Sequence, residues 1–124
     1  MTALWTRLVP VVSVATAALL FAACGDERDP ARPMTQGEQL ALDSGCTACH
    51  GSNGEGGVGP GWQGLYQSEV TLEDGSTVVV DEAYLFEAIR DPSAKTRDGY
   101  GVMPANSLDD AEVQAIVDFI ITLK

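Results

Sequence analysis

Apolar residues recur at helical spacing in three segments after residue 34, and the first of these begins at a clear start signal. Thr35 and Glu38 have the spacing of a capping box. The apolar residues 40–42 continue the pattern toward Cys46. We therefore predict a short helix that begins at Thr35 and delivers Cys46.

The second and third segments predict two further helices. Asp81 can cap a helix that runs to about Arg90 and ends before Pro92. The last helix is predicted to begin at Ser107, with Asp110 in the acidic place of a capping box. The apolar side of the helix after Asp81 comprises Tyr84, Leu85, Ala88 and Ile89. The apolar side of the last helix comprises Leu108, Ala111, Val113, Ile116, Val117, Ile120 and Leu123.

Residues 69–80, EVTLEDGSTVVV, show a different pattern, because apolar and polar positions alternate around Asp74-Gly75. Such alternation around an Asp-Gly pair predicts a β-hairpin. A two-stranded ribbon is marginal alone, so we expect it to lie against the helices. The residues predicted to face one another across it are Val70 and Leu72 on one strand and Thr77 and Val79 on the other. The chain is thus predicted to be mainly α, with three or more helices and a β-hairpin insertion.

The most apolar part of the chain is residues 8–23, which follow the positively charged Arg7 and end in small residues before Cys24. At about sixteen residues this stretch is short for a membrane span and has the features of an export signal. Its ending, Phe21-Ala22-Ala23-Cys24, resembles a bacterial lipoprotein cleavage box, which predicts a lipid on Cys24. An ordinary signal peptide or an uncleaved anchor is the alternative, and both also place the rest of the chain outside the cytoplasm.

These patterns divide the chain into a lipoprotein signal peptide (1–23), a lipidated cysteine with a flexible tether (24–34) and one domain (35–124). The formal charge of the whole chain is −11, and removal of Arg7 with the signal leaves six basic residues against 18 acidic ones, or 6 − 18 = −12. This charge argues against nucleic-acid binding. It provides either solubility or electrostatic steering toward a basic partner, and the sequence leaves both open.

The segment SGCTACHGSNGEGGVGP, residues 44–60, holds Cys46, Cys49 and the only histidine of the chain, His50. A disulfide would leave His50 unexplained. A structural zinc site needs four ligands, commonly from two Cys/His pairs. The chain has no second histidine and no second cysteine pair, since Cys24 is its only other cysteine. The glycines spell G-x-G-x-x-G, but they follow Cys-x-x-Cys-His and not a strand, so a phosphate loop is disfavoured.

Covalent haem attachment accounts for each unusual residue of this segment. Two thiols three positions apart can add to the two vinyl groups of one porphyrin, and the next residue then projects toward the iron. Cys46 and Cys49 are therefore the predicted thioether residues, and His50 is the predicted proximal ligand. The surrounding glycines allow a tight turn and close approach to the macrocycle, or simply provide loop flexibility.

A second axial ligand must come from elsewhere, because His50 is the only histidine. The methionines that remain after signal removal are Met34 and Met103. Met34 is too close in sequence to cross easily to the opposite face of the haem. Met103 lies 53 residues after His50, in a loop where Pro104 fixes the following backbone. Met103 is therefore the predicted second ligand.

Together these features resemble the class I monohaem cytochrome c family over residues 35–124. The matching marks are Cys46-Thr47-Ala48-Cys49-His50, Gly59-Pro60, Met103-Pro104 and the final helix ending in Ile120-Ile121-Thr122-Leu123. The stretches GPGWQGLY, LEDGSTVVVDEAYLFEAIRDP and GYGVMP more closely resemble the cytochrome c domain found fused to subunit II of some haem-copper oxidases. The chain has no room or ligands for the two-copper domain of such a subunit, so we expect a free-standing domain.

The resemblance implies further site residues. The Pro60 carbonyl is expected to accept a hydrogen bond from the His50 ring. Trp62, Tyr66 and Tyr100 are candidates to line the haem edge or approach its propionates, and each could equally belong to the core.

The function expected from these residues is one-electron transfer and not catalysis: a membrane-tethered carrier with one His/Met-ligated haem c, in a respiratory-type chain. It is expected in the periplasm or on the outer face of the cell membrane. Its expected partners are a redox donor and acceptor, with a haem-copper oxidase among the candidates. The alternatives are a haem subunit stably bound to an oxidase or dehydrogenase, and a haem peroxidase or gas sensor. A peroxidase or sensor needs an open iron position, against which Met103 argues.

Overall fold

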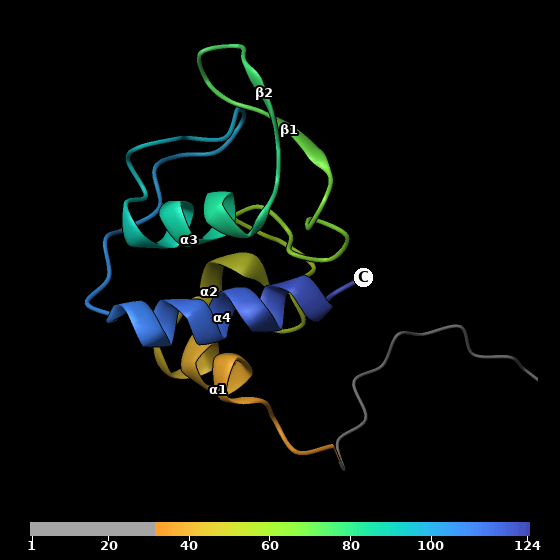
Figure 1. Cartoon of the computed structure of the whole chain (residues 1–124), viewed down its shortest axis with the longest axis vertical. Coiled ribbons are helices and arrows are strands. Elements are labelled where there is room, and N and C mark those ends of the chain that lie inside the picture. The colour runs from red at the N-terminus through yellow and green to blue at the C-terminus, as the bar shows by residue number, and fades with distance from the viewer. Residues whose placement is uncertain (1–31) are drawn as a thin grey trace, which may run out of the picture.

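The structure is a computed structural model that describes residues 32–124, so the predicted signal peptide and Cys24 lie outside the described residues. The described chain has four helices and one two-stranded antiparallel sheet, which confirms the mainly α prediction. In Figure 1, α4 crosses the molecule between α1 and α3, and the hairpin projects beyond α3. The elements in chain order are α1 (Gln36–Asp43), α2 (Thr47–His50), β1 (Glu69–Thr71), β2 (Thr77–Val79), α3 (Glu82–Arg90) and α4 (Asp110–Thr122).

Two of the three predicted helix starts are confirmed. The Thr35 hydroxyl accepts a hydrogen bond from the Glu38 amide at 3.2 Å, and the Glu38 carboxylate accepts one from the Thr35 amide at 3.3 Å. Asp81 caps α3 by accepting from the Tyr84 amide at 2.7 Å, and α3 ends at Arg90 as predicted. These side chains satisfy amide groups that the first turn of a helix leaves without partners.

The predicted start of the last helix is wrong. The capping residue of α4 is Asp109 and not Ser107, and its partner in the capping box is Glu112 and not Asp110. The Leu108 amide instead donates to the Asn106 side chain at 3.2 Å, which keeps this residue in the preceding loop. Asp109 and Glu112 determine the start of α4, because the side chain of each accepts a hydrogen bond from the backbone amide of the other, both at 2.9 Å.

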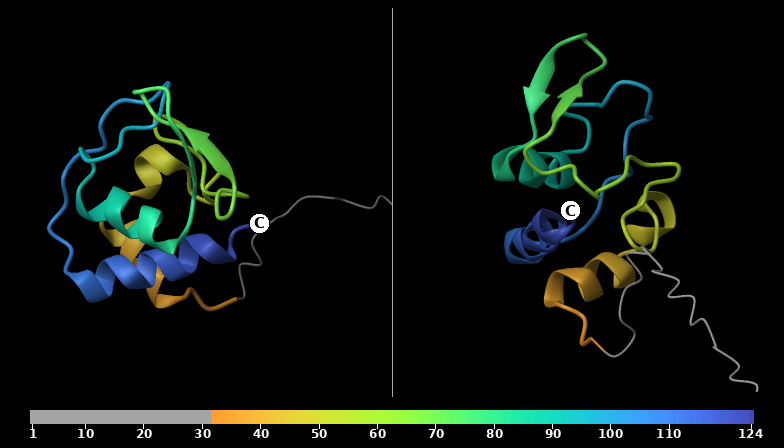
Figure 2. Two further views of the ribbon diagram at one scale, coloured as in Figure 1. Left: turned by 45° about the horizontal axis from the view of Figure 1, so that its top comes forward. Right: turned by 90° about the vertical axis from the view of Figure 1, so that its right-hand side faces the viewer.

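The hydrophobic core is centred on α4, which packs against α1 on one side and α3 on the other (Figure 2). Most of the predicted stripe of this helix is buried, but Ala111 is exposed and Phe119, which the stripe omitted, is buried. Packing against both α1 and α3 explains the burial of Phe119, because two partner helices bury a wider face than one stripe. Ala111 lies in the first turn of α4, at the exposed end of the helix. The buried residues of α4 are Val113, Ile116, Val117, Phe119 and Ile120.

The hairpin forms, but its predicted register is wrong by one residue. Val70 pairs with Val78, and Thr71 pairs with Thr77. The Leu72 amide donates to the Ser76 carbonyl at 2.8 Å, so the loop contains three residues and not the two of Asp74-Gly75 alone. Gly75 has φ +82°, as expected for the last position of a three-residue hairpin loop. The side chains of β2 are therefore reversed relative to β1: Val78, and not Val79, shares the face of Val70, and Val79 is exposed.

The inner face of the hairpin packs on the helical body. This was predicted, because an isolated two-stranded ribbon is only marginally stable. Val70 is 3% exposed and Val80, just after β2, is fully buried. The other edge of β1 is covered by the loop between α3 and α4: Leu72 forms an isolated antiparallel bridge with Arg97. In Figure 1 this loop rises beside α3 toward the hairpin and returns to α4. Among residues 32–124, no helix combines the length and apolar character needed to cross a membrane.

Candidate functional site

The Cys-x-x-Cys-His segment forms the short helix α2. Cys46 is its capping residue, and the His50 amide donates to the Cys46 carbonyl at 3.0 Å, closing one helical turn. This turn brings the two thiols and the imidazole to one region, as the spacing predicted. Both thiols are free and half-buried, so the disulfide alternative is not adopted. Burial raises the pKa of the Cys46 thiol above its usual value of 9.0, which keeps it protonated at neutral pH.

The glycine-rich loop folds back over α2. The Gly56 amide donates to the His50 carbonyl at 2.8 Å, and the Gly59 amide donates to the Cys49 carbonyl at 2.9 Å. These bonds satisfy carbonyls at the end of the helix. A β-carbon on Gly59 would lie only 2.8 Å from His50 Cε1 and 3.0 Å from Nδ1. Gly59 is therefore required because its backbone lies against the imidazole ring.

The His50 ring is 8% exposed and is held on two sides. Its Nδ1 lies 2.7 Å from the Pro60 carbonyl oxygen, so the hydrogen bond implied by the family resemblance is present. Because a carbonyl oxygen can only accept, Nδ1 carries the proton and Nε2 keeps its lone pair. The Trp62 ring stacks on the imidazole with centroids 4.8 Å apart, and Phe119 contacts Trp62 edge-on. The ring is thus oriented with Nε2 available as a ligand.

A cavity of about 330 Å³ adjoins α2, and most of the predicted site residues line it. Met103 is among them, whereas Met34 is not and is 43% exposed. The predicted residues that line this cavity are Cys46, Cys49, His50, Pro60, Trp62, Tyr100 and Met103. The structure therefore brings together, from positions 46 to 103, the residues that the sequence selected.

Tyr66 is the exception among the predicted site residues. It does not line the cavity, and its half-buried side chain packs against the hydrophobic core. Its neighbour Leu65 lines the cavity instead. Successive residues of this turn face different parts of the molecule, and Tyr66 takes the core position that the sequence left open as its alternative.

The remaining cavity wall was not identified as such from the sequence. It comes mainly from α3, from α4 and from the loop between them, and its apolar members appeared in the sequence only as ordinary helix faces. An apolar helix face in the sequence indicates that the face is buried, but not whether a cavity or other side chains lie against it. No local signal therefore separates the cavity wall from the hydrophobic core. The wall residues from these parts include Tyr84, Leu85, Ala88, Ile89, Pro92, Lys95, Thr96, Arg97, Asn106, Ile116 and Ile120.

The loop that carries Met103 is anchored at both ends. At its start, the Glu73 amide donates to the Thr96 carbonyl at 3.0 Å, and the Asp98 amide donates to the Thr71 carbonyl at 2.9 Å. At its end, the Asn106 side chain donates to the Ile89 carbonyl at 2.7 Å. These bonds join the loop to the hairpin and to α3.

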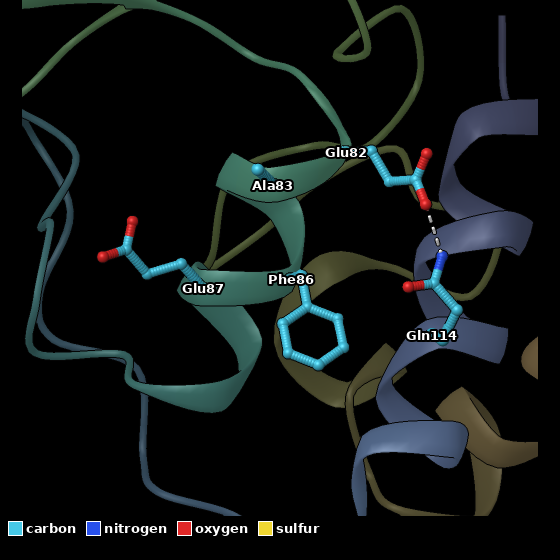
Figure 3. A pocket seen from close by; sticks show the side chains of 5 residues that line it. All are labelled: Glu82, Ala83, Phe86, Glu87 and Gln114. Carbon is cyan, nitrogen blue, oxygen red and sulfur yellow. Dashed lines mark hydrogen bonds between the residues drawn. The ribbon is translucent and has the colours of Figure 1, made fainter.

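A second, more open hollow lies on the surface between α3 and α4 and contains none of the predicted residues (Figure 3). Gln114 bridges the helices by donating to Glu82 at 2.8 Å, and Phe86 lies beside this bridge. Across residues 32–124, no three His, Cys, Asp or Glu side chains are grouped as a metal site requires. The chemistry of the described chain is therefore concentrated at the cavity beside α2.

Comparison with known proteins agrees with this geometry. A search of curated protein sequences gave no match. The sequence model of the family described as "Cytochrome c" matches residues 34–124, which include every residue of the cavity. The chain therefore belongs to the cytochrome c family: it is a small class I cytochrome c that carries haem c covalently.

Proposed function

We propose that this cytochrome c is a one-electron carrier in which His50 and Met103 provide the two axial ligands of the haem iron. The observation that carries the proposal is that the only histidine of the chain and Met103 line one cavity, while Met34 lies elsewhere and is exposed. A family match alone supports an electron-carrying haem protein. The ligand pair determines whether that protein transfers electrons or also binds small molecules.

The residues present fit a covalently attached haem. Two free thiols stand one helical turn apart at the cavity, and the adjacent imidazole has its Nε2 free to bind a metal. The wall is largely apolar, with Leu85, Ile116 and Ile120 among its members. When bound, haem c supplies an iron that accepts and releases one electron.

The chain's own residues would then perform three tasks. Pro60 fixes the tautomer of His50 and raises the basicity of its Nε2. The apolar wall excludes water, which favours the less charged state of the centre. The Met103 thioether is a soft ligand and favours the reduced metal over a harder ligand. With both metal ligands supplied by the protein, the haem would offer no position for a substrate.

The anchors of the Met103 loop support this role. A ligand that stays in place in both redox states must be held against thermal motion, because rearrangement slows electron transfer. The bonds from Thr96 and Asp98 to the hairpin, and from Asn106 to α3, restrain the loop on both sides of Met103. Pro104 further restricts the backbone next to the sulfur.

The proposal also includes where the carrier works. The apolar segment before Cys24 supports export and lipid attachment, and the polar residues 24–34 support a tether between that lipid and the domain. We propose a periplasmic or outer-face location in a respiratory-type chain. A haem-copper oxidase is the proposed acceptor class, on the resemblance of the sequence to domains fused to such oxidases.

The test compares Met103→Ala with Met34→Ala in the holoprotein. Both variants keep Cys46, Cys49 and His50, so haem attachment should persist in each. We expect Met103→Ala to lower the reduction potential and to let carbon monoxide bind the ferrous iron, visible as a change in the reduced spectrum. Met34→Ala should leave both properties unchanged.

The opposite outcome, an iron opened by Met34→Ala and not by Met103→Ala, would show that the ligand assignment is wrong. Ready binding of carbon monoxide by the unmodified protein would contradict the carrier function itself and favour a sensor or peroxidase.

A further inference from the structure

The lysine and arginine side chains that line the cavity have no acidic counterpart in its lining. No aspartate or glutamate lines it, although the chain contains 18 acidic residues and only seven lysines and arginines. The two cations that line it are Lys95 and Arg97. In a chain of this net charge, a cavity wall without carboxylates and with two cations is suited to an anionic ligand.

The two cations differ in their partners. The Lys95 ammonium forms an ion pair with Glu87. Arg97 is half-buried, and among residues 32–124 no carboxylate forms an ion pair with its guanidinium. Its described contact is with Tyr100, whose ring centroid lies 5.5 Å from the guanidinium carbon. Arg97 is therefore the cation whose charge remains available to a ligand in the cavity.

The hairpin sets the direction of the Arg97 side chain. Leu72 and Arg97 are paired in an antiparallel bridge, flanked by the two backbone bonds from Glu73 to Thr96 and from Asp98 to Thr71. Side chains of directly paired residues lie on the same face of the ladder. Because Leu72 is only 7% exposed, its face is the inner one. The bridge thus turns Arg97 inward, toward Tyr100 and the cavity.

We propose that Arg97 binds a propionate carboxylate of the haem. This inference rests on the proposed haem site and adds a residue that neither the motif nor the predicted ligands include. A carboxylate moved into a partly buried site is costly unless it is paired. A guanidinium can donate two parallel hydrogen bonds to one carboxylate. The contact with the Tyr100 ring restricts the orientation of the guanidinium plane that carries these two donors. The hairpin, which carries no haem ligand, thereby positions a cofactor-binding residue.

The experiment compares Arg97→Gln with Arg90→Gln in the holoprotein and measures the midpoint potential as a function of pH. Arg90 is a matched control: it also has a guanidinium, but it pairs with Asp110 and does not line the cavity. Besides the Cys-x-x-Cys-His residues, the other ionisable groups on the cavity wall are Lys95, Tyr84 and Tyr100, and all stay in place in both variants. Burial raises the pKa of the Tyr84 phenol, which keeps it neutral at neutral pH.

An adjacent cation lowers a carboxylic acid pKa, so its removal should move the propionate inflection of the Arg97→Gln profile upward by about one pH unit or more. The potential should also fall, because a positive charge no longer opposes oxidation. Arg90→Gln should keep the inflection of the unmodified protein. Equal inflections in Arg97→Gln and the unmodified protein, or equal shifts in both variants, would overturn the proposal.

Arg97→Lys provides a second test if Arg97→Gln does not accumulate with haem. Lysine keeps the charge and loses the two-donor fork, so the propionate bending band in the resonance Raman spectrum should shift even where the potential changes little. An unshifted band would overturn the proposal. Failure of the His50/Met103 ligation is distinguishable, because it appears as carbon monoxide binding by the unmodified protein and leaves the propionate measurements interpretable.

Discussion

The crossing of α1 and α4 depends on the absence of a side chain at Gly37. A β-carbon at this position would overlap the Ala115 carbonyl oxygen of α4 and would lie 2.6 Å from the carbonyl carbon. It would also lie 2.9 Å from Phe119 Cβ. Gly37→Ala therefore requires the two helices to separate, since the colliding atoms belong largely to backbone that cannot rotate away.

Two opposing effects set the size of the change. The Ala115 carbonyl carbon falls about 0.8 Å short of an ordinary 3.4 Å contact, and its oxygen falls shorter still, so the helices must separate by more than this. A gap of about 0.5–1 Å already forfeits a quarter to a half of the dispersion attraction between facing atoms. Overpacking costs typically about 1–3 kcal/mol, and a backbone collision places this case at the upper end. Alanine restores about 1 kcal/mol of helix propensity. The net loss is therefore about 2 kcal/mol, or roughly 8–16 °C in Tm for a domain of this size.

Guanidinium unfolding of the holoprotein, followed by far-UV circular dichroism, measures this loss. We expect a lower midpoint at an unchanged m value, which indicates lost stability and not a change in the exposed area. Gln36→Ala, at the exposed preceding position of α1, is the control and should stay within about 0.5 kcal/mol of the unmodified protein. A Gly37→Ala midpoint equal to that control, or a higher one, would refute the close helix crossing.

Three further predictions concern the His50 ring, the anchor and the partner. Gly59→Ala should displace the imidazole, weaken its 2.7 Å bond to Pro60 and raise the potential through a less basic ligand. Ser52→Ala is the control, because Ser52 is exposed in the same loop and does not line the cavity. An unchanged potential in Gly59→Ala would contradict the steric argument. Cys24→Ser should abolish lipidation and release the protein from membranes, and unchanged mass and membrane association would count against the lipoprotein hypothesis. Electron transfer to a basic partner should slow as salt rises, whereas salt-independent rates would leave the acidity a role in solubility alone.

The features that the sequence predicted correctly are encoded by nearby residues. The cap of α1 and the turn of α2 each involve side chains within one helical turn, so spacing alone identifies them. Met103 could be selected because the chain offers few alternatives, and the structure places it on the cavity. Its role as a ligand stays a prediction.

The errors arise where two local solutions compete or where a distant partner decides. Asp109 and Ser107 both offer a helix start, and Glu112, which reciprocates only with Asp109, determines the outcome. In the hairpin, Gly75 serves a two-residue or a three-residue loop equally well on sequence grounds. The role of Gly37 could not be predicted from the sequence, since its close contact with Ala115 joins residues 78 positions apart.

The same distinction separates haem attachment from the proposed haem ligation. Attachment needs Cys46 and Cys49, which lie three positions apart in the sequence and within one helical turn. Placement of Met103 and Arg97 depends instead on bonds between the loop, the hairpin and α3, which form only when the whole domain folds. The hairpin carries no ligand, yet its free edge holds the start of the loop in register through Leu72. A β-strand edge binds backbone without regard to side chains, so the sequence showed a hairpin but not the segment that it restrains. The features that would set the electron affinity of the centre thus depend on tertiary structure, while attachment of its cofactor depends on one short helix.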